Sequence, residues 1–74
     1  MTYEMIREIF NLCSNNQMRD VFVTEVETDD TDLIAQSFCT GSHCTIEKEL
    51  RADGVIVYEL NTDGLRQRIS FTPD

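Results

Sequence analysis

The fold is decided by residues 45–71, TIEKELRADGVIVYELNTDGLRQRISF, in which alternating side chains are interrupted twice by glycine-containing turns. Alternation of apolar and polar residues is typical of a strand with one buried face. The interruptions, at 52–54 and 61–64, hold the Asp, Asn and Gly residues that tight turns favour. This stretch therefore predicts a three-stranded antiparallel meander, with strands at 45–51, 55–60 and 65–71.

The pattern also predicts how the first two strands pair. A three-residue loop ending in a left-handed Gly54 collects apolar residues on one face, whereas a two-residue loop would set Glu47 opposite Leu60. The three-residue loop is therefore the better choice. It pairs Leu50 with Ile56, Lys48 with Tyr58, and Ile46 with Leu60.

For the second turn we predict a four-residue loop at 61–64, which brings Leu60 opposite Leu65 and Ile56 opposite Ile69. The resulting core face carries Ile46, Leu50, Ile56, Tyr58, Leu60, Leu65, Ile69 and Phe71. The opposite face carries Glu47, Glu49, Glu59, Arg66 and Arg68. On that face both arginines lie at cross-strand distance from Glu59, which is a favourable arrangement on an exposed sheet.

Residues 3–15 predict an amphipathic helix. Four apolar side chains, Ile6, Ile9, Phe10 and Cys13, follow the i, i+3, i+4, i+7 spacing that aligns them on one helical face. Thr2 can cap the first turn, and the asparagines at 15–16 can end the helix. Packing of this helix on the meander gives the expected fold class, α+β, with an N-terminal amphipathic helix on a small antiparallel sheet.

Between these parts, residues 21–27 predict a strand because they are rich in Val, Phe and Thr. Residues 32–39 are ambiguous. As a helix they have Thr31 or Asp30 as the cap and Ile34 and Phe38 on one face, with Gly41 just beyond the end. As a strand, neither alternating set is cleanly apolar, so the caps favour a short helix.

Length and charge restrict the classes of function. Seventy-four residues predict one domain, 1–74, as a monomer or homodimer. Fourteen acids against six bases give a net charge of −8, with a single lysine. Nucleic acids and anionic membranes attract clustered Lys and Arg, so this composition disfavours both as direct ligands. The N-terminal sequence shows neither an export signal nor a membrane span, so we expect a cytoplasmic protein.

The segment Cys39 to Cys44 is a candidate metal or thiol site. It holds two thiols and His43, and Cys13 is a third thiol elsewhere. Zinc accepts such ligands, but the gap between the cysteines is four residues and no second pair follows. A regulatory thiol pair is the other functional interpretation, but an odd number of cysteines without an export signal favours ordinary reduced thiols, which we predict. We expect no metal and no cofactor, and the single histidine gives no catalytic constellation, so we expect no enzyme.

An acidic cluster is the second candidate. Five carboxylates occur within eight residues with no base among them: Glu25, Glu27, Asp29, Asp30 and Asp32. The calcium-loop pattern is not matched. The cluster is either a solvated turn or a surface for a basic protein. We therefore expect a non-enzymatic, acidic protein-interaction or regulatory module facing a basic partner. The alternative function is a thiol or zinc-binding protein that uses Cys39, His43 and Cys44.

Overall fold

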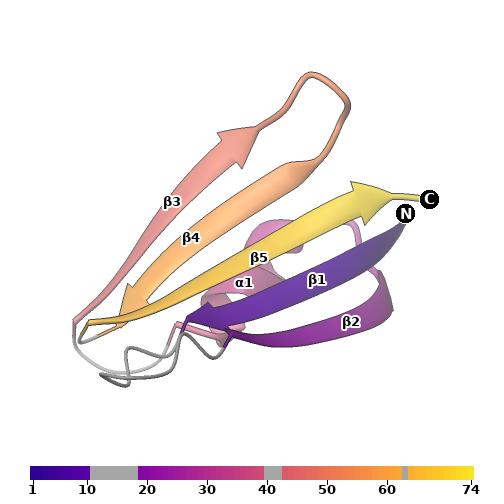
Figure 1. Cartoon of the computed structure of the whole chain (residues 1–74). Coiled ribbons are helices and arrows are strands. Elements are labelled where there is room, and N and C mark those ends of the chain that lie inside the picture. Colours follow the sequence, from indigo (N-terminus) through magenta and orange to yellow (C-terminus); the bar gives the residue numbers. More distant parts are fainter. Residues whose placement is uncertain (11–18, 40–42, 63) are drawn as a thin grey trace.

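A computed structural model describes residues 1–10, 19–39, 43–62 and 64–74, of which Arg19 is described by its backbone only. Its elements are β1 (Thr2–Phe10), β2 (Arg19–Glu27), α1 (Thr31–Ser37), β3 (Cys44–Leu50), β4 (Ile56–Thr62) and β5 (Leu65–Pro73). The five strands form one sheet in the order β2-β1-β5-β4-β3, and all neighbours are antiparallel (Figure 1). The protein is therefore predominantly β, with one short helix among the described residues.

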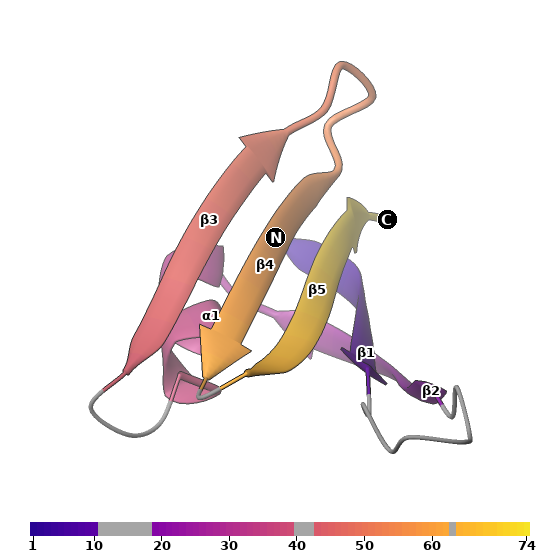
Figure 2. The same cartoon turned by 60° about the vertical axis from the view of Figure 1, so that its left-hand side comes forward.

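The sheet is strongly twisted, and α1 covers one of its faces (Figures 1 and 2). β1 lies inside the sheet, between β2 and β5, so the first and last strands of the chain pair with each other. The register sets Tyr3 opposite Pro73, and the Asp74 amide donates to the Thr2 carbonyl at 3.1 Å. Consequently the two ends of the chain lie side by side, and β2 and β3 form the two edges.

The prediction of an N-terminal helix is wrong, and with it the α+β class. Residues 2–10 form β1, in which Met5 points to the α1 face while Ile6 and Phe10 point to the opposite face. Both faces of β1 carry partly buried apolar residues, Ile9 on the α1 face and Ile6 and Phe10 on the other, so its apolar residues do not alternate. Ile6, Ile9 and Phe10 therefore matched a helical period by coincidence. Cys13 and the stop at 15–16 lie outside the described residues.

Long-range pairing decides this segment against its helical period. Residues 2–10 contain β-branched and aromatic side chains, among them Tyr3, Ile6, Ile9 and Phe10, which fit a pleated sheet better than a helix. β1 pairs along its whole length with β2 and along most of it with β5. Hydrogen bonds to both neighbouring strands replace those that a helix would form within the segment, and the local sequence pattern shows neither partner.

The meander is confirmed, and so is its first register. Leu50 pairs with Ile56, and Gly54 has the expected left-handed backbone with φ of 87°. The second turn is shorter than predicted, because Thr62 pairs with Leu65. The register is thus shifted by two residues, which sets Tyr58 rather than Ile56 opposite Ile69. A shift of two leaves every side chain on its predicted face.

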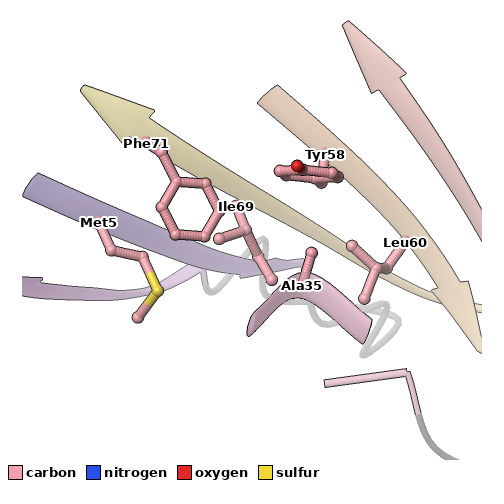
Figure 3. Packing of buried hydrophobic residues seen from close by; sticks show 6 residues of the cluster. All are labelled: Met5, Ala35, Tyr58, Leu60, Ile69 and Phe71. Carbon is pink, nitrogen blue, oxygen red and sulfur yellow. The ribbon is translucent and has the colours of Figure 1, made fainter. Parts of the chain in front are cut away.

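The core forms where α1 lies on the sheet (Figure 3). Its buried residues are Met5, Ala35, Tyr58, Leu60, Ile69 and Phe71. The Tyr58 and Phe71 rings meet edge to face with centroids 5.6 Å apart, a favoured aromatic geometry. Leu50 and Leu65 were predicted for this core, but they are 70% and 36% exposed. A helix of seven residues is too short to reach both ends of the meander.

The predicted helix at 32–39 is confirmed as α1. Asp30 is its N-cap, and the Asp30 Oδ1 accepts a hydrogen bond from the Asp32 amide at 3.0 Å, which satisfies a backbone donor that the first helical turn leaves free. Ala35 is 0% exposed against the sheet, and Ile34 and Phe38 pack at the border of the core. Gly41, predicted to follow the helix, lies outside the described residues.

The contact at Ala35 gives a test of the fold. Ala35→Glu introduces an unpaired charge between α1 and the sheet, so we expect a loss of about 3 kcal/mol in the free energy of unfolding. Gln36→Glu introduces the same charge at the neighbouring, exposed position and should change stability by less than about 0.5 kcal/mol. Urea unfolding followed by circular dichroism measures both. Equal stability of the two variants would contradict the packing described.

Candidate functional site

The two edges of the sheet differ in what they expose. The middle of β2 is apolar and accessible, with Val21, Phe22 and Val23 exposed by 48%, 50% and 62%. The middle of β3 carries Glu47, Lys48 and Glu49, all exposed. Charged side chains on an edge strand discourage pairing with another chain, whereas an apolar edge invites it. In the described part of the chain β2 is therefore the open edge.

The hydrogen bonds show which backbone groups of β2 face outward. The Thr28 amide donates to the Met1 carbonyl at 3.0 Å, so Met1 and Thr28 form a hydrogen-bonded pair in the β1–β2 register. Such pairs alternate along an antiparallel ladder. Even-numbered β2 residues thus bond to β1, and the amides and carbonyls of Val21, Val23 and Glu25 point away from the sheet.

Glu25 and Glu27, two of the five predicted partner-binding residues, lie at the end of this edge. Both are exposed, and both lie on the sheet face opposite α1, in line with Val21 and Val23. No ion pair in the described part of the chain involves either carboxylate. These two glutamates are therefore open to a partner.

The next two predicted residues, Asp29 and Asp30, occupy the turn before α1. Asp30 caps the helix, as described above. Asp29 is fully exposed, and its Oδ1 lies 3.3 Å from the N-terminal ammonium group. Exposed ion pairs of this kind contribute little to stability. Asp29 thus keeps a free side for an incoming cation, while Asp30 already has a structural role.

Asp32, the fifth predicted residue, is half exposed, but its carboxylate is engaged by other side chains of the protein. Its carboxylate accepts a hydrogen bond from the Tyr58 hydroxyl, and Lys48 Nζ lies 3.1 Å from Oδ1. The Tyr58 hydroxyl also lies 2.7 Å from Thr31 Oγ1. These contacts tie the first turn of α1 to β3 and β4. Asp32 is therefore part of the scaffold rather than of the open acidic surface.

The same contacts shift three pKa values. The hydrogen bond from Tyr58, and then the one from Lys48, lower the pKa of the Asp32 carboxyl below its ordinary value of 3.8. The hydrogen bond to Asp32 raises the pKa of Lys48. Burial, followed by the hydrogen bond to Asp32, raises the pKa of Tyr58 above 10.0. At neutral pH the cluster is thus held with Asp32 and Lys48 charged and Tyr58 neutral.

Glu4 belongs to the acidic surface, although the sequence reading missed it. It is exposed on β1 directly opposite Glu25. Two like charges at cross-strand distance repel each other, and no described cation pairs with either residue. Only recognition of residues 2–10 as a strand would have placed Glu4 beside Glu25. We call Glu4, Glu25 and Glu27 the acidic patch.

Arg7 holds the α1 side of the edge in place. Its guanidinium lies 4.4 Å from the centroid of the Phe38 ring and 5.8 Å from that of Phe22. Its Nε donates to Gln67 Oε1 at 3.1 Å. Cation–π contacts and a hydrogen bond together fix the guanidinium. The Phe22 ring is therefore held in place by Arg7 while half of the residue stays exposed to solvent.

The two described arginines of the open face pair with one glutamate on the same face. Arg68 lies 2.9 Å and Arg66 3.5 Å from the Glu59 carboxylate, as the sequence predicted. Both guanidinium groups also lie within 6.0 Å of the Phe10 ring centroid. Because both arginines pair with Glu59, neither offsets the negative charge of the acidic patch. The open face therefore has two bases beside Glu59 at its centre and the acidic patch at the end beside β2.

Two of the three cysteines are not reduced thiols. Cys39 and Cys44 are joined by a disulfide, with Cα atoms 5.7 Å apart, within the usual range for such a bond. This corrects the prediction of reduced thiols. It also removes Cys39 and Cys44 from the candidate zinc ligands, of which the exposed His43 was the third in this segment. Among the described residues no three potential metal ligands lie together. Disulfides persist mainly in oxidising environments. The cytoplasmic location is not tested by the structure and stays a prediction.

Comparison with known proteins adds no assignment: no protein-family model, no curated protein and no solved structure shows significant similarity to this chain. In the described residues, no helix has the length and apolar character needed to cross a membrane. Any functional conclusion must therefore come from the exposed chemistry of the sheet itself. That chemistry is concentrated at β2 and the acidic patch.

The contacts of Tyr58 give a pH test. In a Tyr3→Phe variant Tyr58 is the remaining tyrosine, and we expect its tyrosinate absorbance to appear with a midpoint above pH 10.0. The folded state holds this proton more tightly than the unfolded state, so stability should fall as pH rises from 10 through the folded-state pKa. Spectrophotometric titration measures the midpoint. The same midpoint in folded protein and in urea would contradict the burial of this hydroxyl.

The disulfide gives a second test. Of the three cysteines, only Cys13 lies outside the bond, so alkylation of the denatured, unreduced protein should add one adduct by mass spectrometry. Prior reduction should allow three. Loss of the crosslink should also lower the free energy of unfolding by about 2 kcal/mol, because the loop that it closes is short. Three adducts without reduction would show that the bond is absent.

Proposed function

We propose that this protein is a non-enzymatic interaction module, which presents the acidic patch and the following turn to a basic surface of a partner protein. The observation that supports the proposal is the grouping of Glu4, Glu25 and Glu27 on exposed, adjacent positions. No described cation neutralises them. A Lys- or Arg-bearing partner would relieve their mutual repulsion and gain charge-assisted hydrogen bonds.

Two other acids of the described structure have bases beside them. Glu59 is paired with Arg66 and Arg68, and Asp32 is paired with Lys48. The acidic patch differs from Glu59 and Asp32 because no described cation pairs with its three glutamates. A patch that served solubility alone would not need two carboxylates directly opposite each other, as Glu4 and Glu25 are, because such an arrangement opposes folding.

The patch also lies where a partner could reach it. Its glutamates face away from α1, and the turn carrying Asp29 follows directly after Glu27. A complex of this kind should form fast at low salt and weaken as salt rises, because exposed charges are screened over about 8 Å at physiological ionic strength. Salt dependence is therefore the expected signature of the interaction.

A matched pair of double variants tests this function. Glu25→Gln with Glu27→Gln removes two charges from the β2 edge, and Glu47→Gln with Glu49→Gln removes two from the β3 edge. Partners captured from the native lysate at low salt are identified, purified and titrated against each variant. We expect the β2 variant to bind about tenfold more weakly and the β3 variant to bind within about twofold of the original protein.

The alternative results are equally clear. If both double variants bind a captured partner equally, general negative charge rather than the acidic patch attracts it. If binding of every captured partner is unaffected by salt, the proposal of a basic partner surface is wrong. Circular dichroism of each variant controls for folding, and the substituted positions are all exposed.

A further inference from the structure

We propose that the partner of this module binds as an extended segment that adds a sixth strand, antiparallel, to the outer edge of β2. This inference rests on the proposed function and specifies how the partner is held. Strand addition uses main-chain hydrogen bonds for affinity and alternate side chains for specificity. The described edge offers both kinds of contact in one line.

The backbone supplies the first part of the argument. β2 is nine residues long, and it ends the sheet in the described part of the chain. The Met1–Thr28 hydrogen bond places the amides and carbonyls of Val21, Val23 and Glu25 on the outer side. An added antiparallel strand would form hydrogen-bonded pairs at these residues.

The side chains supply the second part. The outward-bonding residues lie on the face opposite α1 in the order Val21, Val23, Glu25, Glu27. Phe22 is half exposed on the other face. An antiparallel segment should therefore carry two alternate basic residues, for Glu27 and Glu25, and then apolar residues for the valines and Phe22. This pattern of charge and apolar contact defines the chemical class of the partner.

The other edge does not offer the same contacts. β3 carries three consecutive charged residues, Glu47, Lys48 and Glu49, in its middle. Lys48 is moreover engaged by Asp32. A row of alternating charge guards an edge against strand addition. The geometry therefore selects β2 rather than β3 as the binding edge.

A second copy of this chain fits the edge poorly. β2 contains one basic residue, Arg19, against Asp20, Glu25 and Glu27. In any antiparallel pairing of β2 with itself, at most one of Glu25 and Glu27 can lie opposite Arg19 of the other copy. Each copy also carries a net charge of −8, which opposes association. Charge complementarity thus favours a basic segment from another protein.

The probe is the labelled peptide acetyl-Lys-Thr-Lys-Thr-Val-Phe-Val-amide, written to pair antiparallel with Glu27 through Val21. We expect saturable binding by fluorescence anisotropy at low salt, and no binding when both lysines are replaced by glutamate. The Glu25→Gln, Glu27→Gln variant should bind about tenfold more weakly, and the Glu47→Gln, Glu49→Gln variant should match the original protein.

N-methylation of the peptide tests the strand itself. In the proposed register the amides of its third and fifth residues point toward β2, and those of its fourth and sixth residues point away. Methylation of the third and fifth amides should weaken binding at least about tenfold, because two interstrand hydrogen bonds are lost. Methylation of the fourth and sixth should change affinity by no more than about twofold.

The outcomes separate this inference from the proposed function. If binding depends on Glu25 and Glu27 but both methylated peptides bind alike, strand addition is overturned and the basic partner surface stands. If the peptide ignores the glutamates and captured partners do so too, both proposals fail. If sedimentation shows a dimer that the peptide does not dissociate and that Val23→Lys does, the edge belongs to a second copy and this inference is overturned.

Discussion

The structure depends on the joint between α1 and the sheet at Tyr58. The Tyr58 ring is buried against Phe71, and its hydroxyl meets both Thr31 and Asp32 in the first turn of the helix. With Ala35 flush against the sheet, these contacts seat a helix of seven residues, which is too short to be stable alone. Without this joint the apolar face around Phe71 would lie open to water, and a small domain has little other surface to bury.

This joint covers only part of one sheet face: it ties α1 to β4 and, through Asp32 and Lys48, to the edge strand β3. Because β1 is enclosed by β2 and β5, the sheet begins with the second strand of the chain and not the first. The edge strand β2 is therefore built from a segment rich in valine, whose residues Val21 and Val23 have no cover in the described structure. The order of the strands, and not the composition of β2, makes these residues available for binding.

Much of the fold was predictable from local signals; the second turn was predicted two residues too long, and the largest error fell on a segment that needs distant partners. The turn at Gly54 and the alternation of 45–60 determine their own register, so the first hairpin was predicted correctly. Asp30 signalled the start of α1. By contrast, residues 2–10 are a strand only because β2 and β5 lie on either side. For the same reason the pairing of Glu4 with Glu25 could not be read from the spacing of the residues.

The candidate site shows the same division between local and long-range information. The acidic stretch 25–32 stands out in the sequence, but its five carboxylates have three different roles, since Asp30 caps a helix, Asp32 bonds to Tyr58, and only the others remain open. Placing Glu25 and Glu27 beside an apolar edge has a physical consequence. An exposed valine-rich edge would pair indiscriminately, whereas two glutamates at its end repel acidic segments, including a second β2, and select basic ones. In the proposed binding mode, the charges that oppose folding locally are thus the ones that would give the edge its specificity.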